Sequence, residues 1–222
     1  LTTAPSAGVT PLISEADLKY SIKDTASSIL AEQLRDSDYI PDAVSVTVTD
    51  PISLTNFNTI DVASASNIIL AGGISDSAAS LAPSGVADGR LTAATTQDSD
   101  VDVQIIGANP TVAEINAVDA LTAGVITATV AENNLATLKT VADANGNNAL
   151  TITVTDTSAA AADLITVDGQ TTVAVTATAV ETITGAAADV KTVVGASGIN
   201  FDGDFAATLS AGTAAAADLN TI

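Results

Sequence analysis

The sequence predicts an α/β repeat solenoid, in which parallel strand ladders are joined by one short helix in each coil of about 26 residues. Three observations predict this fold class. A short motif recurs along most of the chain, runs of alternating Val or Ile and Thr precede Ala-rich stretches, and the apolar residues are mostly aliphatic. Hydrophobic residues make up 47% of the chain but aromatic residues only 2%, which suits a narrow repeating core better than a globular one.

The motif consists of a small residue, Asp or Asn, an aliphatic residue, any residue, Thr, and Val or Ile. Residues 162–167 are a clear copy, and a related form begins with Asp24 and again with Asp76. Neighbouring copies are 23 to 34 residues apart, a spacing that is typical of solenoids. The central apolar residues of the copies are Ile29, Phe57, Leu81, Ile115, Leu138, Leu164, Val190 and Leu219.

Each step along the chain has the same internal order. A run of alternating apolar and polar residues comes first, as in residues 44–49, 149–155 and 171–178, and this alternation predicts a half-buried strand. An Ala-rich stretch follows, such as residues 158–164, and predicts a short helix that needs neighbouring coils to cover its apolar face. Gly or Asn then turns the chain, as at Gly169.

These signals divide the chain into four parts. We expect an extended lead-in at residues 1–20, a repeat block at 21–82, an irregular insertion at 83–110, and a second repeat block at 111–222 that continues beyond the segment. The alternative fold is a tandem of all-β sandwich domains. Such domains are about 100 residues long, so the much shorter repeat argues against them.

The charge and the missing residue types exclude several classes of function. The chain has 26 acidic and 6 basic residues, so neither nucleic acid nor an anionic membrane surface is an expected partner. It has no Cys and no His, and no pair of a nucleophile and a base can be assembled, so we predict that it is not an enzyme. No apolar run approaches the length of a membrane span, and we expect no membrane insertion.

One acidic stretch is a candidate calcium site. If residues 98–102 form a strand, then Asp98, Asp100 and Asp102 place three carboxylates on one face of it. Carboxylate oxygens are ligands that calcium prefers, and the ion would relieve their mutual repulsion. The alternative is a solvated loop, or an edge strand whose charges protect it from pairing with another chain.

A second candidate calcium site lies further along the chain. Asp143, Asn145 and Asn147 resemble the first half of an EF-hand loop, but Val154 occupies the twelfth position, where that loop needs Glu. A turn between a helix and a strand is the alternative. The sequence therefore predicts no required cofactor, and calcium is the one candidate ion.

Three stretches of the chain resemble repeats of very large secreted or cell-surface proteins from cyanobacteria and other Gram-negative bacteria. They are residues 20–29, 161–169 and 180–190, and the likeness extends over most of residues 20–222. Some proteins of that kind also carry calcium-binding RTX segments. The RTX nonapeptide G-G-x-G-x-D is not present here, because Gly72 and Gly73 are followed by Ile-Ser-Asp. The resemblance implies a surface, adhesive or matrix role and names no ligand.

We therefore expect a non-catalytic structural or adhesive protein at the cell surface, outside the cell. In this reading the repeats form a stiff acidic rod within a filament, sheath, surface layer or matrix. Its partners would be copies of itself, further repeats of the same chain, or surface glycans. One alternative is the spacer stalk of a calcium-dependent RTX-type adhesin. Another is a viral fibre or a carbohydrate-binding module, although the scarcity of aromatic residues argues against sugar binding.

Overall fold

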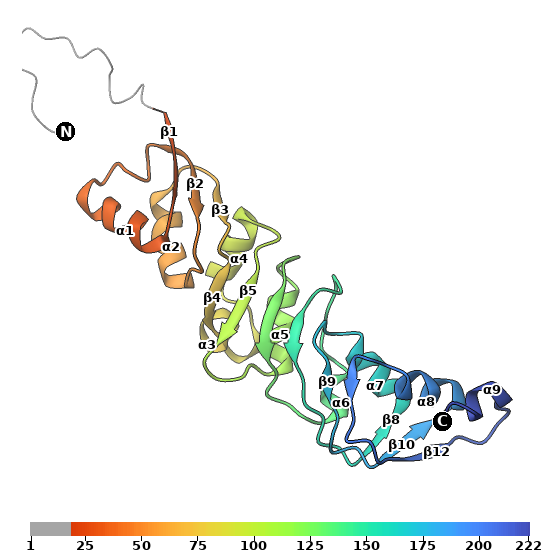
Figure 1. Ribbon diagram of the computed structural model, residues 1–222. Coiled ribbons are helices and arrows are strands. Elements are labelled where there is room, and N and C mark those ends of the chain that lie inside the picture. Colours follow the sequence, from red (N-terminus) through yellow and green to blue (C-terminus); the bar gives the residue numbers. More distant parts are fainter. Residues whose placement is uncertain (1–18) are drawn as a thin grey trace, which may run out of the picture.

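The computed structural model describes residues 19–222. It has a mixed α/β structure in which the strands of each sheet pair in parallel. The molecule is elongated, and β1 and α9 lie at its opposite ends (Figure 1). The predicted lead-in, residues 1–20, lies outside the described residues except for Lys19 and Tyr20. No helix within the described range is long and apolar enough to cross a membrane.

Strands and helices follow one another along the chain, and most of them are short. The strands are β1 (Tyr20–Asp24), β2 (Ala43–Val48), β3 (Ile68–Leu70), β4 (Ile74–Ser77), β5 (Val103–Ile106), β6 (Ile126–Thr129), β7 (Ala149–Thr151), β8 (Ser158–Ala160), β9 (Val175–Thr176), β10 (Thr182–Gly185), β11 (Ile199–Asn200) and β12 (Ala206–Leu209). The helices are α1 (Ala26–Arg35), α2 (Leu54–Ala63), α3 (Ala78–Leu81), the 3-10 turn η2 (Pro83–Gly85), α4 (Gly89–Gln97), α5 (Val112–Asp119), α6 (Leu135–Leu138), α7 (Ala161–Asp168), α8 (Ala187–Val194) and α9 (Ala216–Leu219).

The described chain divides into strand–helix units, each of which contacts the units before and after it. The principal contacts between elements of different units all join consecutive units. The units therefore follow one another along the length of the molecule (Figure 1). Units 1 to 8 comprise residues 20–42, 43–67, 68–97, 98–124, 125–147, 148–173, 174–197 and 198–222.

The strand register gives the spacing of the units. Ala159 of β8 pairs with Ile183 of β10, which in turn pairs with Ala207 of β12, so the chain returns to the same sheet position after 24 residues. The first three strands also pair in chain order, as β1-β2-β3. Parallel neighbours need a crossover connection, and the helix of each unit supplies it.

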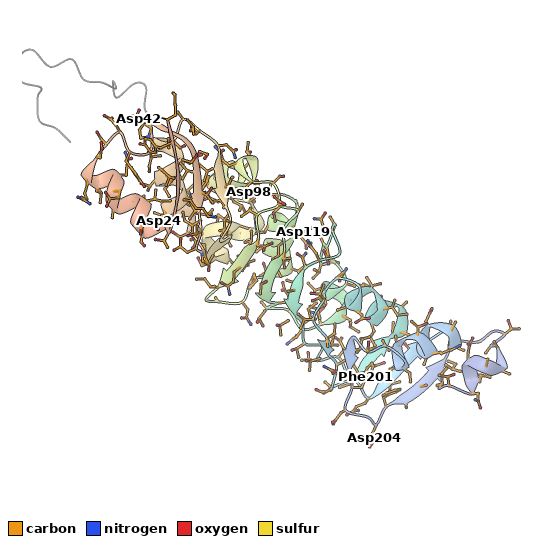
Figure 2. The ribbon with its side chains drawn as sticks, turned by 45° about the horizontal axis from the view of Figure 1, so that its top comes forward. Asp24, Asp42, Asp98, Asp119, Phe201 and Asp204 are labelled. Carbon is orange, nitrogen blue, oxygen red and sulfur yellow. The ribbon has the colours of Figure 1, made fainter. Side chains whose placement is uncertain are left out.

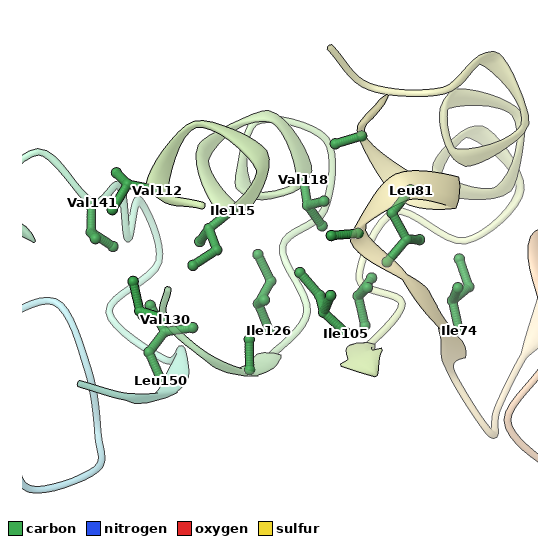
Figure 3. Close-up of a cluster of buried hydrophobic side chains, with 14 of the residues drawn as sticks. Ile74, Leu81, Ile105, Val112, Ile115, Val118, Ile126, Val130, Val141 and Leu150 are labelled. Atoms are coloured by element: carbon green, nitrogen blue, oxygen red, sulfur yellow. The ribbon is translucent and has the colours of Figure 1, made fainter. Parts of the chain in front are cut away.

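The helices bury the apolar residues that the repeated motif predicts. All eight central motif residues lie in helices, and seven of them are at most 1% exposed. They face the strands: Ile115 and Val118 of α5 point toward Ile126 and Ile105 (Figure 3). The exception is Leu219 of α9, which is 49% exposed because no further unit covers it within the described chain.

Residues 83–110, predicted as an irregular insertion, contain η2, α4 and β5. Pro83 follows α3, and Ser84 and Gly85 adopt positive φ angles of 56° and 77°, so the chain turns sharply there. Asp88 then caps α4 by accepting a hydrogen bond from the Arg90 N–H at 2.9 Å. Helix α4 packs on α2, whereas α3 and η2 pack on α5, so unit 3 presents a helix to each of its neighbours.

We predict that the same substitution has unequal effects at two equivalent motif positions. Leu164→Ala should lower the free energy of unfolding by about 3 kcal/mol, because Leu164 is fully buried and its truncation leaves a cavity. Leu219→Ala should lower it by no more than about 1 kcal/mol, because that side chain is half exposed. Urea unfolding followed by far-UV circular dichroism measures both. Equal losses at the two positions would contradict this account of the core.

Candidate functional site

The first predicted calcium stretch forms a turn between α4 and β5, rather than a strand. Asp98 Oδ2 accepts a hydrogen bond from the Leu70 N–H at 2.8 Å, and Asp102 Oδ1 accepts one from the Val125 N–H at 2.8 Å. Leu70 belongs to unit 3 and Val125 to unit 5, so these two carboxylates of unit 4 bind units on opposite sides. Asp100 is exposed. The expectation of three carboxylates on one strand face is therefore wrong in its geometry, because each outer carboxylate binds a different neighbouring backbone.

Burial raises the pKa of the Asp98 carboxyl above its usual value, and the nearby Asp100 carboxylate adds to the rise. The hydrogen bond from Leu70 opposes this effect without cancelling it. The charged form of Asp98 is thus disfavoured in the folded chain. A bound cation at this position would favour the charged form.

The second predicted stretch is a bend in which the side chains bind the loop itself. Asp143 Oδ1 accepts from the Asn147 N–H at 3.2 Å, and its Oδ2 accepts from the Asn148 N–H at 3.4 Å. Gly146 lies in the left-handed region with φ of 68°, as such a turn requires. The Asn147 amide donates to Ala123 O at 3.0 Å, and Asn145 is exposed. Asp143 and Asn147 are therefore brought together, through a backbone hydrogen bond.

No group of three or more acidic, His or Cys side chains that could hold a metal ion occurs in residues 19–222. The labelled acids Asp24, Asp98, Asp119 and Asp204 are instead spread along the length of the molecule (Figure 2). Asp119 and the fully buried Asn148 form a pair in which Asn148 Nδ2 donates to Asp119 Oδ1 at 2.8 Å. This pair is a buried connection between units that offers no open position to a ligand.

A recurring contact that the sequence analysis missed joins an acidic side chain to the helix of the preceding unit. In four places a carboxylate accepts a hydrogen bond from the first N–H group of that helix, which has no partner within the helix itself. The contacts are Asp50 with Ala26 at 2.7 Å, Asp76 with Leu54 at 3.0 Å, Glu132 with Val112 at 2.9 Å, and Asp156 with Leu135 at 2.8 Å.

The signal for these contacts was present in the sequence. Each acid follows the first residue of the preceding helix by 20 to 24 residues, close to the repeat spacing. The related motif that begins with Asp76 contains one of them. A search for acids at the repeat spacing from helix starts would have found the set.

A groove of about 210 Å³ lies over β4, β5 and β6 and is the place where a small molecule was considered. Asp102 is the single titratable residue of its lining, and that carboxylate already accepts a hydrogen bond from Val125. General acid–base or nucleophilic chemistry needs at least two cooperating groups. The groove therefore supplies no catalytic arrangement. Its lining residues are Pro51, Gly72, Ile74, Asp102, Val103, Gln104, Val125 and Thr127.

No family model, curated protein sequence or solved structure matches this chain. Its function must therefore follow from its own residues and from their arrangement. The carboxylate contacts between units are the most regular polar feature of that arrangement.

We predict that Asp98→Asn raises the free energy of unfolding at neutral pH. An amide keeps the acceptor for the Leu70 N–H and does not repel Asp100. Because the folded-state pKa is raised, the wild-type penalty is present at neutral pH and disappears as the pH falls below about 4, where the unfolded carboxyl is also protonated. Urea unfolding at several pH values measures the difference, with Asp202→Asn in an exposed loop as the control.

The same variant tests the calcium hypothesis. If calcium binds at residues 98–102, millimolar calcium should stabilise the wild type and have less effect on Asp98→Asn. Sedimentation and circular dichroism with and without calcium provide the readout. An equal response of both proteins would remove Asp98 from any calcium site.

We also predict that removal of one contact between units destabilises the chain. Asp156→Ala should lower the free energy of unfolding by about 1 kcal/mol, because the first N–H group of α6 loses its acceptor. Asp156→Asn should lower it by less, because an amide oxygen can still accept the bond. Asp202→Ala is the control, and an equal loss there would show that only net charge matters.

Proposed function

We propose that this chain is a non-catalytic rod segment of an extracellular, cell-surface protein, and that its units are coils of an α/β solenoid. The observation that carries the proposal is the constant register step, in which Ala159, Ile183 and Ala207 occupy one sheet position at intervals of 24 residues. A chain that advances by one unit in each step grows in length without a change in cross-section. Such a rod suits a filament, sheath, surface layer or matrix.

The contacts between neighbouring units support a rod that resists bending. Besides the carboxylates that bind preceding helices, two ion pairs join consecutive helices. Lys139 Nζ lies 3.0 Å from Asp163 Oδ2, and Lys191 Nζ lies 2.8 Å from Asp218 Oδ1. Backbone ladders, packed aliphatic side chains and these polar contacts all cross each boundary, so bending would have to break several of them together.

The surface chemistry supports a structural role outside the cell. The net charge of −20 keeps such rods apart in solution and disfavours nucleic acid and anionic membranes as partners. The resemblance of residues 20–29, 161–169 and 180–190 to repeats of secreted and cell-surface bacterial proteins points to the same setting. Residues without Cys, Met or His are also compatible with an exposed, oxidising environment.

A spacer stalk is the second candidate, and the exposed apolar residues of unit 8 favour it. A stalk would continue into further coils of the same chain, which would cover Leu219 and Ile222. A carbohydrate-binding module receives less support. The ring pairs within residues 19–222 are Tyr20 with Tyr39 and Phe201 with Phe205, and they do not form a line of exposed stacking platforms.

A deletion of one whole repeat tests the rod directly. Removal of residues 159–182 joins Ser158 to Ile183, its counterpart being one register step away, so the sheet position is kept. We predict that this protein folds and that its maximum dimension falls by about 5 Å, the spacing of neighbouring strands. Small-angle X-ray scattering and circular dichroism measure both properties.

The control is removal of residues 159–170, which deletes half a repeat and places the wrong residues opposite each other. That protein should lose much of its secondary structure. Equal damage from both deletions, or a compact scattering profile of the intact chain, would contradict the proposed rod.

A further inference from the structure

The last unit of the chain has an apolar face that every earlier unit covers. Leu219 is 49% exposed and Ile222 is 38% exposed. At the equivalent positions of unit 7, Val190 and Val193 are both fully buried. Ala207 of β12 is exposed as well, whereas its register partner Ile183 is fully buried. Unit 8 therefore presents the kind of surface that a further unit buries.

The strand of unit 8 is also open on one side. β12 is the edge strand of the sheet β12-β10-β8, and its inner side pairs with β10 in parallel. Its outer side has no strand partner within the described chain. An exposed edge of this kind is a template for another strand.

The first unit carries the complementary features at the opposite end of the molecule. β1 is the edge strand of the sheet β1-β2-β3. One residue separates β1 from α1, just as one residue separates β10 from α8. β1 therefore stands in the same relation to its helix as the strand that pairs with β12 from the other side.

Asp24 repeats the local geometry of a carboxylate that binds a preceding unit. Asp76 Oδ1 accepts from the next N–H, of Ser77, at 2.8 Å, while its Oδ2 binds Leu54 of the preceding unit at 3.0 Å. Asp24 Oδ1 likewise accepts from the next N–H, of Thr25, at 2.7 Å. Asp24 Oδ2 has no partner among residues 19–222. Asp24 is thus arranged to receive an N–H from a unit that would precede unit 1.

We propose that unit 8 of one copy docks against unit 1 of a second copy, head to tail, with β1 adding to the outer edge of β12 in parallel. This inference rests on the proposed rod. The contact buries Leu219 and Ile222 and gives Asp24 Oδ2 a main-chain donor. Because the two surfaces differ, repetition of the contact produces an open filament and not a closed dimer.

The distribution of charge favours this contact over a tail-to-tail one. Lys19, Lys23 and Arg35, at the start of the described chain, are three of the six basic residues of the protein. Residues 198–222 contain three acids and no basic residue. Two copies of unit 8 facing each other would oppose three acids with three acids, whereas unit 1 offers cations beside its acids.

Sedimentation velocity over a range of protein concentrations tests the proposal. The full chain should form species that grow beyond a dimer as its concentration rises to the millimolar range. The double variant Leu219→Asp and Ile222→Asp should weaken this association at least about tenfold, because it places two charges in the contact. Asp24→Ala should weaken it by a smaller factor.

Ile106→Asp is the matched control, because Ile106 is 47% exposed and lies between the two ends, on β5. It should leave the association unchanged. A chain that remains monomeric, stops at a dimer, or responds equally to the control overturns the head-to-tail contact. Scattering from the double variant keeps the two proposals apart: an elongated monomer retains the rod even if the contact fails, and a compact one removes the rod itself.

Discussion

The structure depends on the burial of aliphatic side chains between each strand–helix unit and its neighbours. A unit of about 25 residues is far too small to enclose a core of its own. Ile115, Leu138 and Leu164 are fully buried because strands and helices of adjacent units close over them. The burial is therefore shared, and each unit is stable only as part of the series. The few aromatic residues follow from the same constraint, because the narrow space between strand and helix accepts branched aliphatic side chains more readily than rings.

Polar contacts then determine how the units are aligned. Aliphatic packing alone tolerates small slips along the strands, whereas a hydrogen bond between a carboxylate and a helix N–H fixes one position. Asp50, Asp76, Glu132 and Asp156 each make such a bond to the preceding unit. Much of the acidity that suggested ion binding thus has a structural use. The Asp98 and Asp102 side chains belong to the same class of contact, since each binds the backbone of a neighbouring unit.

The sequence predicted the parts of the fold that depend on local patterns. The motif identified the buried helix residues, and alternation located β2 near residues 44–49. It overestimated strand length at 171–178, where β9 comprises Val175–Thr176, because alternation continues into segments that bend away from the ladder. It did not predict α4, whose apolar stripe is limited to residues such as Leu91 and Ala94. The partners of Asp98 and Asp102 are 28 and 23 residues away, so no local pattern indicates them.

The two halves of the chain meet the same requirement with different residues. In the first half, helix starts receive a side chain from the following unit or from their own cap, such as Thr25, Ser53 or Thr111. From α7 onward the residue before each helix is Ala, and no side chain caps the helix. Gly185 approaches Ala161 instead, and a Cβ at Gly185 would lie 3.3 Å from the Ala161 Cβ. Close approach of the backbones replaces the acid there, at the cost of unsatisfied helix N–H groups. The later units should consequently be held more by apolar contact than by polar contact, which makes the cover over the last of them decisive for local stability.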